Sequence, residues 1–255
     1  MIEQWKSYKF LFSELVKRDF KKKYKRTVLG MIWSVLSPLL SVLVLMLVFV
    51  HFFGRTQEHY IIYLFSGTLV MNFYSECTKG GMRALVSNAS IFTKINIPKT
   101  LFLFSKCVQS FINFGLTFII YIVFCICDHV KFGPHMLMLF FPILTLMIFS
   151  VGVGMTLSSL FVFFKDVEYL YGIFLLLLHY VSAIFYPVTI VPEAYQKFFY
   201  MNPIYCYIKY FRMITIETMI PSLTIHALCL GFALFMLGVG CLTYKKFRNE
   251  FLYYV

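Results

Sequence analysis

The sequence predicts an all-α membrane protein with six transmembrane helices in one membrane domain, residues 29–255, after an interfacial helix in residues 1–28. The 255 residues are 60% hydrophobic and only 13% charged, with a mean hydropathy of +0.80. A soluble domain has about twice that share of charged residues. The hydrophobic residues also form long uninterrupted blocks, and a helix needs about 20 apolar residues to cross a bilayer.

The N-terminal segment has the pattern of an amphipathic helix over residues 4–26. Aromatic residues such as Trp5, Phe12 and Phe20 recur at helical spacing, while lysines occupy the other side. A basic helix with an aromatic face lies in the headgroup layer of a membrane. The segment is too charged to hold the apolar core of a signal peptide.

The hydrophobic blocks that follow predict six spans. Their approximate bounds are 31–53, 60–82, 103–127, 136–164, 169–187 and 222–244. The fourth contains Pro142, which a span tolerates when neighbouring groups satisfy the freed carbonyl. The fifth is short, ends at Pro187, and leads into an aromatic segment with several prolines that we expect to fold back into the outer leaflet.

The charge distribution predicts the orientation. With the N-terminus inside, the cytoplasmic segments carry 18 of the 23 Lys and Arg residues and the outer segments carry five. Positive residues concentrate on the cytoplasmic side of membrane proteins, so both termini are expected there, in the cytoplasmic membrane. The basic run 21–26 abuts the first span, where it would meet anionic lipid rather than nucleic acid.

Catalytic and metal chemistry have little support in the sequence. The seven cysteines are scattered without a CxxC pair, and His51, His179 and His226 are isolated in sequence. The apolar blocks contain no pair of carboxylates. No GxxxxGK[ST] phosphate loop is present, so an ATP-driven process would bind ATP and magnesium in a separate polypeptide. We therefore predict no catalytic residue, metal or cofactor in this chain.

Glu76 is the only acidic residue inside a predicted span. A charge there costs about 2.5–3.5 kcal/mol on insertion scales, so it should face a partner or a cavity. Lys79 and Arg83 follow one and two turns later, which leaves two interpretations: an internal ion pair, or a polar access site for an anionic lipid headgroup. The second interpretation also includes three residues of the basic run, Lys22, Lys25 and Arg26.

Two polar stripes follow the helical repeat. Ser34, Ser37 and Ser41 share one face of the first span, and Gln109 and Asn113 belong to a similar stripe on the third, with Lys106 and Thr117. Small polar residues often join spans by interhelical hydrogen bonds. The alternative is a hydrated pathway for a polar substrate.

Aromatic residues concentrate at the outer end of the fifth span and beyond it. The candidates are Tyr180, Phe185, Tyr186, Phe198 and Tyr200. An interfacial aromatic belt explains them as well as a surface that contacts sugars does.

Four stretches, taken in order, make the chain resemble the membrane subunit of type-two ATP-binding-cassette exporters, in the branch that exports O-antigen, teichoic acid and capsular polysaccharide. These stretches are the basic arm running into 29–39, the segment 88–98, the segment 163–167, and 183–212 with its Asn202-Pro203 and Tyr210-Phe211-Arg212 motifs. In the third stretch, Lys165 stands where the family commonly has arginine, and lysine lacks the planar fork that a bidentate contact needs.

The resemblance implies a homodimer with two nucleotide-binding ATPase subunits beneath it. It also implies a coupling helix at about 88–98 and short re-entrant or gate helices at about 188–209 on the outer side. The glycan would pass between the two protomers, and its lipid carrier would enter laterally from the membrane. The coupling residues would be Asn88, Ile91, Phe92, Lys94, Ile97 and Pro98.

Two other functions stay open at this point. A related exporter of drugs, haem or another lipid would share the fold. A membrane-embedded glycolipid enzyme should show an acidic pair or a His/Arg set at one membrane face, and the sequence contains no such set.

Overall fold

The computed structural model describes most of the chain as helix. The described residues are 2–24, 27, 29–53, 59–94 and 97–254. They contain no strand, which confirms the predicted all-α class. The long helices are α1 (Ile2–Tyr24), α2 (Trp33–Phe53), α3 (Tyr60–Arg83), α5 (Thr100–Cys127), α6 (Phe140–Phe163), α7 (Val167–Val181) and α10 (Leu223–Phe247).

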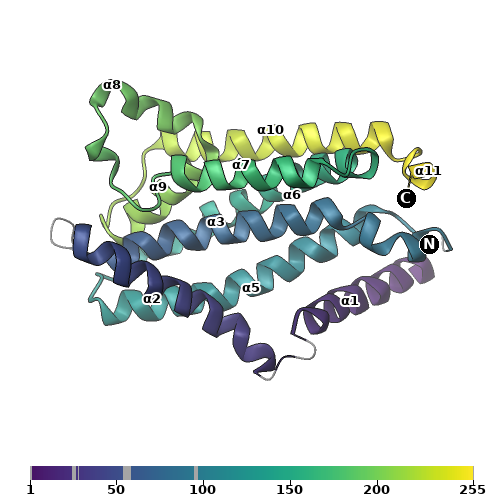
Figure 1. The fold of residues 1–255 in the computed structure, drawn as a ribbon, viewed down its shortest axis with the longest axis horizontal. Helices are drawn as coiled ribbons and strands as arrows, with labels where there is room; N and C mark the ends of the chain where they lie inside the picture. The colour runs from purple at the N-terminus through teal and green to yellow at the C-terminus, as the bar shows by residue number, and fades with distance from the viewer. Residues whose placement is uncertain (1, 25–26, 28, 54–58, 95–96, 255) are drawn as a thin grey trace.

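The two ends of the bundle differ. Both termini, α4 (Ala89–Phe92) and α11 (Phe251–Tyr254) lie at one end, which we call the terminal end (Figure 1). Short helices lie at the opposite, distal end: η4 (Val188–Ile190), α8 (Glu193–Gln196), η5 (Lys197–Met201) and α9 (Pro203–Thr215). If the long axis crosses the membrane, the terminal end is the side that the charge distribution assigns to the cytoplasm.

Helix α3 is the centre of the bundle. It is buried over most of its length and packs against α5 and α6, so its side chains meet protein on several sides. This explains how Ser66, Thr68 and Thr78 can lie in a membrane helix. Each is buried and donates its hydroxyl to a backbone carbonyl of the preceding turn.

Helices α6 and α10 approach closely through glycines. A Cβ atom added at Gly152 would collide with the backbone of Met236 and Leu237, and one added at Gly240 would collide with the backbone of Gly152. On the other side of α6, a Cβ at Gly81 would lie 3.2 Å from the Cα of Gly154. The hydrophobic effect does not drive helices together inside lipid, so membrane helices associate through such close backbone contacts.

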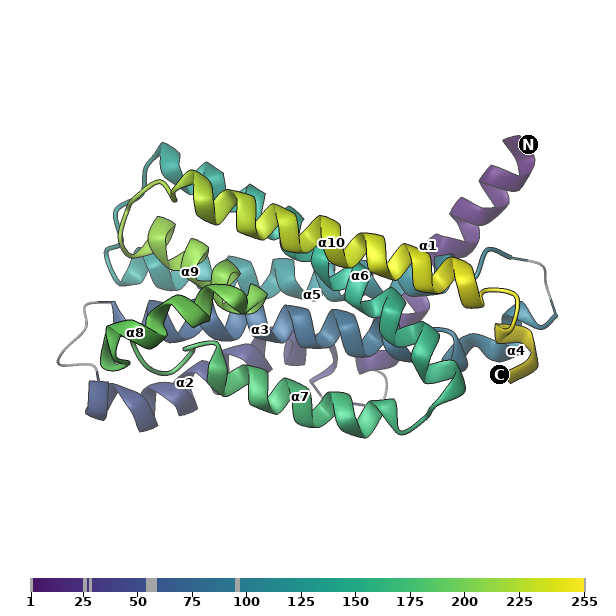
Figure 2. The same cartoon turned by 90° about the horizontal axis from the view of Figure 1, so that it is seen from above.

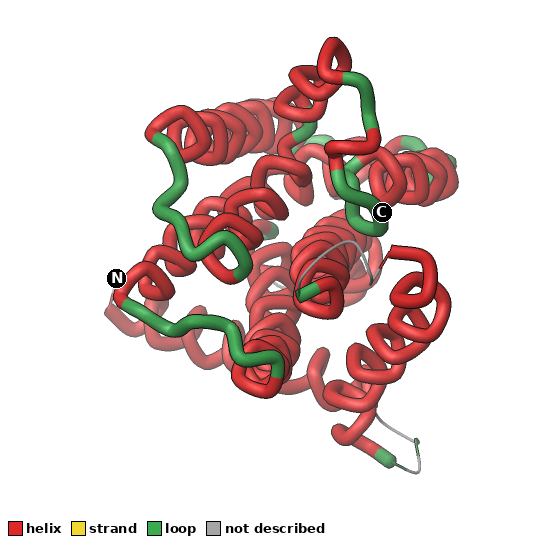
Figure 3. Tube along the Cα trace, turned by 90° about the vertical axis from the view of Figure 1, so that its left-hand side faces the viewer, coloured by secondary structure: helices red, strands yellow, loops and turns green. Residues whose placement is uncertain are grey.

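Helices α2 and α7 form the walls of an open face on α3. In Figure 1, α3 lies between α7 above and α2 below, and Figure 2 shows both displaced to the same side of α3. Both are weakly attached: α7 buries only Tyr171 and Leu175 among its residues. Figure 3, viewed from the distal end, shows the helices of the bundle nearly end-on. We call the surface between these two helices the α3 face.

Three helices of the described chain are long and apolar enough to cross a membrane: Thr100–Cys127, Pro134–Phe163 and Leu223–Phe247. Helices α2 and α7 have shorter apolar stretches, at Leu36–Val48 and Val167–Val181. The helices nevertheless run back and forth between the two ends as six spans require (Figure 1). The count of six stays a prediction.

Two of the predicted spans begin or end elsewhere. The fifth span was expected to reach Pro187, but α7 ends at Val181, because the Ser182 hydroxyl donates to the Leu178 carbonyl and Ala183 has a left-handed backbone (φ 51°). The fourth span begins as a 3-10 helix, η3 (Pro134–Leu139). Pro142 therefore lies in the first turn of α6, where a missing N–H costs little.

The predicted coupling segment is built differently, whereas the gate segment consists of short helices. The described residues of 88–98 contain one short helix, α4, after the 3-10 turn η2 (Val86–Asn88), instead of one helix along the segment. The segment 188–209 forms the four short helices of the distal end, and the last of these, α9, continues to Thr215. Helix α9 starts there because Asn202 caps it, accepting from the Ile204 N–H at 3.0 Å, and Pro203 fits its first turn.

Candidate functional site

The α3 face holds a polar cavity of about 620 Å³ between α2, α3 and α5. The glycan-path candidates Ser37, Ser41 and Asn113 and the headgroup candidate Glu76 come from three predicted spans, and all four line it together with Thr117. The Asn113 side-chain amide donates to the Glu76 carboxylate at 2.6 Å. This contact stabilises a charge that would otherwise be costly at this depth. Ser34 of the same stripe lies outside the residues whose side chains are described.

A second cavity, of about 440 Å³, follows along the same helix toward the terminal end. Lys79 and Arg83 of α3 line it together with Glu168 of α7, and Arg83 forms an ion pair with Glu168. Glu76 and the two basic residues therefore do not form the single site that was proposed, and Arg83 pairs across helices instead of within α3. Lys22, Lys25 and Arg26 lie outside the residues whose side chains are described.

The two cavities give the α3 face a polar floor and apolar walls. On α7 the outward-facing Leu170, Ile173 and Leu177 are all exposed, and on α2 so are Leu43 and Leu47. A polar strip between apolar helices suits a polar chain moving beside lipid. In one copy of the chain this strip is open on one side.

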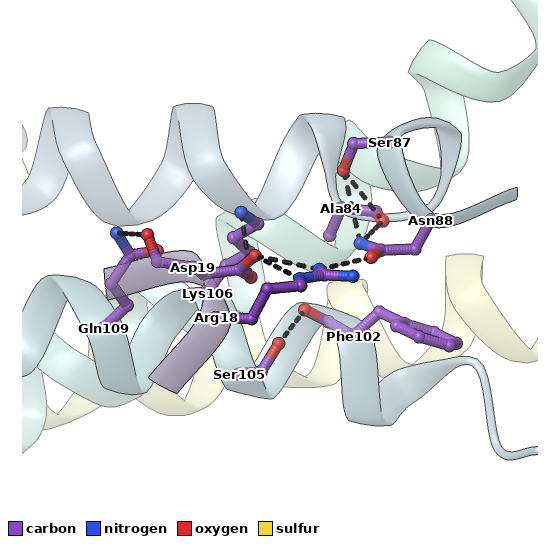
Figure 4. A network of polar contacts seen from close by, with 9 residues as sticks. All are labelled: Arg18, Asp19, Ala84, Ser87, Asn88, Phe102, Ser105, Lys106 and Gln109. Carbon is purple, nitrogen blue, oxygen red and sulfur yellow. Dashed lines mark hydrogen bonds and ion pairs between the residues drawn. The ribbon is translucent and has the colours of Figure 1, made fainter. Parts of the chain in front are cut away.

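At the terminal end a polar network fastens α1 to the bundle (Figure 4). Asp19 is 4% exposed and forms ion pairs with Arg18 at 2.8 Å and with Lys106 of α5 at 2.9 Å. Arg18 also donates to the side-chain oxygen of Asn88 at 2.7 Å. Because Asn88 directly precedes α4, the network joins α1, α5 and the connection between α3 and α5.

Gln109 belongs to this network and not to the polar cavity. Its side-chain amide donates to the backbone carbonyl of Asp19 at 3.3 Å, and its side chain is buried (Figure 4). It lies one helical turn from Asn113 on the same stripe, but at that level α1 covers α5. Gln109 therefore joins helices, which corrects its proposed place on the substrate pathway.

The proposed coupling residues divide into buried and exposed groups. Asn88 is 1% exposed and Ile97 is 8% exposed, so their side chains lie inside this chain and not on a docking surface. Ile91 is half-buried and packs on the core, while Lys94 and Pro98 are exposed. The side chain of Phe92 lies outside the described ones. The exposed part of this segment is therefore smaller than expected.

The C-terminal tail meets the same end of the molecule. The Lys99 ammonium donates to the Arg248 carbonyl at 2.7 Å and lies 5.6 Å from the ring centroid of Phe251. Partial burial lowers the pKa of Lys99 from its ordinary value. Tail and coupling segment are thus attached to each other.

The five aromatic candidates at the distal end do not form one surface. The rings of Tyr180 and Phe185 lie 6.1 Å apart, and the Tyr186 hydroxyl donates to the Tyr180 carbonyl at 3.0 Å, so these three make one cluster. Phe198 is 63% exposed. Tyr200 lines a separate cavity of about 270 Å³.

The most connected residue of the distal end is Arg212, which was counted only as an outer charge in a motif. It is 6% exposed, and its guanidinium donates to the carbonyls of Ala183 at 2.9 Å, Ile184 at 3.1 Å and Tyr63 at 3.2 Å. It also lies 3.3 Å from the centroid of the Tyr63 ring. Hydropathy placed Arg212 between the fifth and sixth predicted spans. The one sequence signal for the burial of Arg212 is the run of apolar residues around it, which is typical of an amphipathic helix.

Among the described residues, no three His, Cys, Asp or Glu side chains come together as metal ligands would.

Comparison with known proteins identifies the family to which this chain belongs. Residues 11–216 match the family described as ABC-2 type transporter. The chain belongs to this family. It is a membrane transport subunit, and ATP hydrolysis belongs to a separate subunit.

Similar proteins cover nearly the whole chain. An O-antigen export system permease protein RfbA of Klebsiella pneumoniae is 24% identical over 94% of both chains. A protein of the same description from Myxococcus xanthus is 22% identical, covering 98% of this chain and 97% of the relative. The polysialic acid transport protein KpsM of Escherichia coli is 20% identical over 91% of both.

Proposed function

We propose that the chain is the permease subunit of an ATP-driven exporter that moves a lipid-linked polysaccharide across the cytoplasmic membrane. The observation that supports this most directly is the α3 face, on which Ser37, Ser41, Glu76 and Asn113 converge between two apolar helices. A glycan needs hydrogen-bonding groups along its path, and its lipid carrier needs apolar surface beside that path.

A second copy would close the path. The polar cavities open on one side of α3, and a channel requires a wall on that side. Two copies facing each other across α3, α2 and α7 would enclose the polar strips and cover the exposed apolar residues of α7. We therefore propose a homodimer in which the glycan passes between protomers.

The terminal end is the proposed docking surface for two ATPase subunits. Short α4 lies at this end of the molecule (Figure 2), and Lys94 and the tail residues Lys245 and Lys246 are exposed. The network of Figure 4 and the Lys99 contact link this surface to α1 and α5. A displacement of α4 would therefore move long helices as well.

Deletion of the gene tests the proposal. Lipid-linked glycan should accumulate inside the cell and disappear from the surface, and the intact gene should restore it. An Asn113→Leu variant, which removes an amide from the path, should export less than a Thr243→Val variant, whose described hydrogen bonds lie within α10. Normal surface glycan after deletion would overturn the proposal. Accumulation of a drug or of a lipid without a glycan would favour the related exporter.

A further inference from the structure

The third cavity, at the distal end, has features of a binding site. Its volume is about 270 Å³, and it lies between α3, the turn after α7, η5 and α9. The side chains that matter for its chemistry are Tyr63, Tyr200, Tyr205, Lys209, Arg212 and Glu217. Three tyrosines, two cations and one carboxylate thus line one small space.

Positive charge dominates the buried part of this cavity. Arg212 is buried, and its described partners are backbone carbonyls, the Ser66 hydroxyl and the Tyr63 ring, none of which carries a negative charge. Glu217 is exposed at the rim, and among the described residues it forms no ion pair with Arg212 or Lys209. Buried charges in proteins are normally paired with an opposite charge, and ionisable groups at membrane depth usually mark function.

Lys209 keeps donors for a ligand. Its ammonium donates to the Tyr200 hydroxyl and lies 4.8 Å from the centroid of the same ring. An ammonium has three N–H donors, so two are left for an oxyanion in the cavity. Such a charge-assisted hydrogen bond is about twice as strong as a neutral one.

The tyrosines supply the other half of the site. The rings of Tyr200 and Tyr205 meet edge to face, with centroids 5.8 Å apart and planes at 90°. Tyrosine combines an apolar ring with a polar hydroxyl, which suits a ligand that has both C–H faces and hydroxyl groups. A sugar ring is such a ligand.

We propose that this cavity binds one acidic saccharide unit, with its carboxylate or phosphate oxygens at Lys209 and its ring against Tyr200 and Tyr205. The inference rests on the proposed function, because it assigns the site to a unit of the exported glycan. The cavity lies at the end opposite the termini, so the unit would be held late in export. The chain would then favour glycans that carry negative charge.

Binding to the purified full chain in phosphatidylcholine nanodiscs tests the site. Saturation-transfer NMR would follow D-glucuronate and D-glucose, and inorganic phosphate would be added as a competitor without a ring. We expect glucuronate to bind more tightly than glucose, and phosphate to displace it only weakly. Lys209→Met should weaken glucuronate binding about tenfold, the effect of losing one charge-assisted hydrogen bond.

Lys197→Met is the matched control, because Lys197 is an exposed lysine of η5 at the same end and outside the cavity. It should bind glucuronate as the unchanged chain does. Equal binding by the Lys209→Met and Lys197→Met variants, or no binding of any probe, would overturn the site. Phosphate competing as well as glucuronate would show a phosphate site and overturn the saccharide assignment.

Deletion of the gene and the binding measurement together separate this inference from the proposed function. If deletion of the gene leaves surface glycan unchanged, the function itself is wrong. If deletion blocks export and only the binding difference between the two variants is missing, the exporter proposal stands and the acidic saccharide site alone is wrong.

Discussion

Arg212 shows how one side chain can hold a turn that has no regular structure. The residues after α7 leave their carbonyls without helical partners, and the Arg212 guanidinium donates to the carbonyls of Ala183 and Ile184. Tyr60 and Tyr63 add hydroxyl donors to the carbonyls of Phe185 and Tyr186, both at 2.7 Å. Arginine presents five N–H donors in a fixed planar fork, whereas lysine has three donors on one rotatable ammonium group.

Replacing Arg212 with Met should therefore destabilise the protein by about 3 kcal/mol, because three buried carbonyls lose their donor. The measurement is the thermal unfolding of the purified chain in detergent. Arg83→Met is the control: Arg83 is exposed, and its ion pair with Glu168 should contribute less than about 1 kcal/mol. Equal stability of the two variants would contradict the role given to Arg212.

The Asp19 network predicts a measurable coupling between two helices. Asp19→Asn and Lys106→Gln should each loosen α1, because each breaks the poorly solvated ion pair that joins α1 to α5, although Asp19 keeps Arg18 as a partner in the second variant. In a double-mutant cycle the coupling should be about 1–3 kcal/mol. The readout is the rate of proteolysis within α1. Additive effects would show that the ion pair contributes nothing, and the exposed Glu14–Lys17 pair is the matched cycle that should be near zero.

Helical spacing predicted part of the site. It placed Ser37, Ser41 and Asn113 on polar helix faces, and in the structure these faces meet beside Glu76. It could not separate Gln109 from Asn113, because one stripe meets different neighbours along its length. It also missed the burial of Asn88, since a polar side chain in a connection is normally exposed unless a distant residue such as Arg18 bonds it.

Among the elements, the contact of α6 with α10 is the tightest described here, and its glycines predict a contrast within one helix. Gly240→Ala places a methyl group against the backbone of Gly152 and should destabilise the protein by about 1–3 kcal/mol. Gly231→Ala on the same helix meets nothing within 4 Å and should be neutral or slightly stabilising. The measurement is the thermal unfolding of both variants, and an equal loss of stability in the two would contradict the close approach of α6 and α10.

The coupling segment predicts a change in export without a change in insertion. Aspartate at both Ile91 and Phe92 should reduce export about tenfold while the partner ATPase still hydrolyses ATP, because the two subunits no longer move together. Lys94→Glu, at an exposed position, should act in the same direction without disturbing the core. Ala194→Asp on α8 is the control at the distal end. If the variants of the coupling segment export as much as the Ala194→Asp control does, the assignment of this segment to coupling is wrong.

The limits of elements were the least predictable part of the fold. The apolar run through α7 continues past Val181, so hydropathy alone extended the span to Pro187. The true end depends on the Ser182 hydroxyl and on a left-handed residue, Ala183, that carries no sequence signal for that conformation. Short helices were expected at 188–209, but helix α9 continues past that segment to Thr215, and its start at Pro203 follows from the Asn202 cap and from a proline that suits a helix start.

At the scale of the whole molecule, the orientation predicts opposite labelling of the two ends. In a chain with Cys127 and Cys241 changed to serine, Lys131→Cys at the distal end should react with a membrane-impermeant maleimide on intact spheroplasts. Lys245→Cys near the terminal end should react only after permeabilisation. The five remaining cysteines are buried and should stay unreactive. The reverse pattern would place the termini outside.

The architecture divides into a firmly packed back and loosely held walls. Helices α3, α5, α6 and α10 share one continuous hydrophobic core, whereas α7 buries two residues and most of the described residues of α2 are exposed or half-buried. Composition predicted that the chain is helical and lies in a membrane. It did not predict which spans form the core, since lipid-facing and protein-facing helices are equally apolar.

This division has an evolutionary consequence. Substitutions on exposed positions of α2 and α7 remove few contacts, so each should cost within about 0.5 kcal/mol of stability. Changes in α3 or along the α6–α10 contact cost several times more. A descendant gene could therefore acquire a different cargo through mutations in the two walls while inheriting the rest of the fold intact.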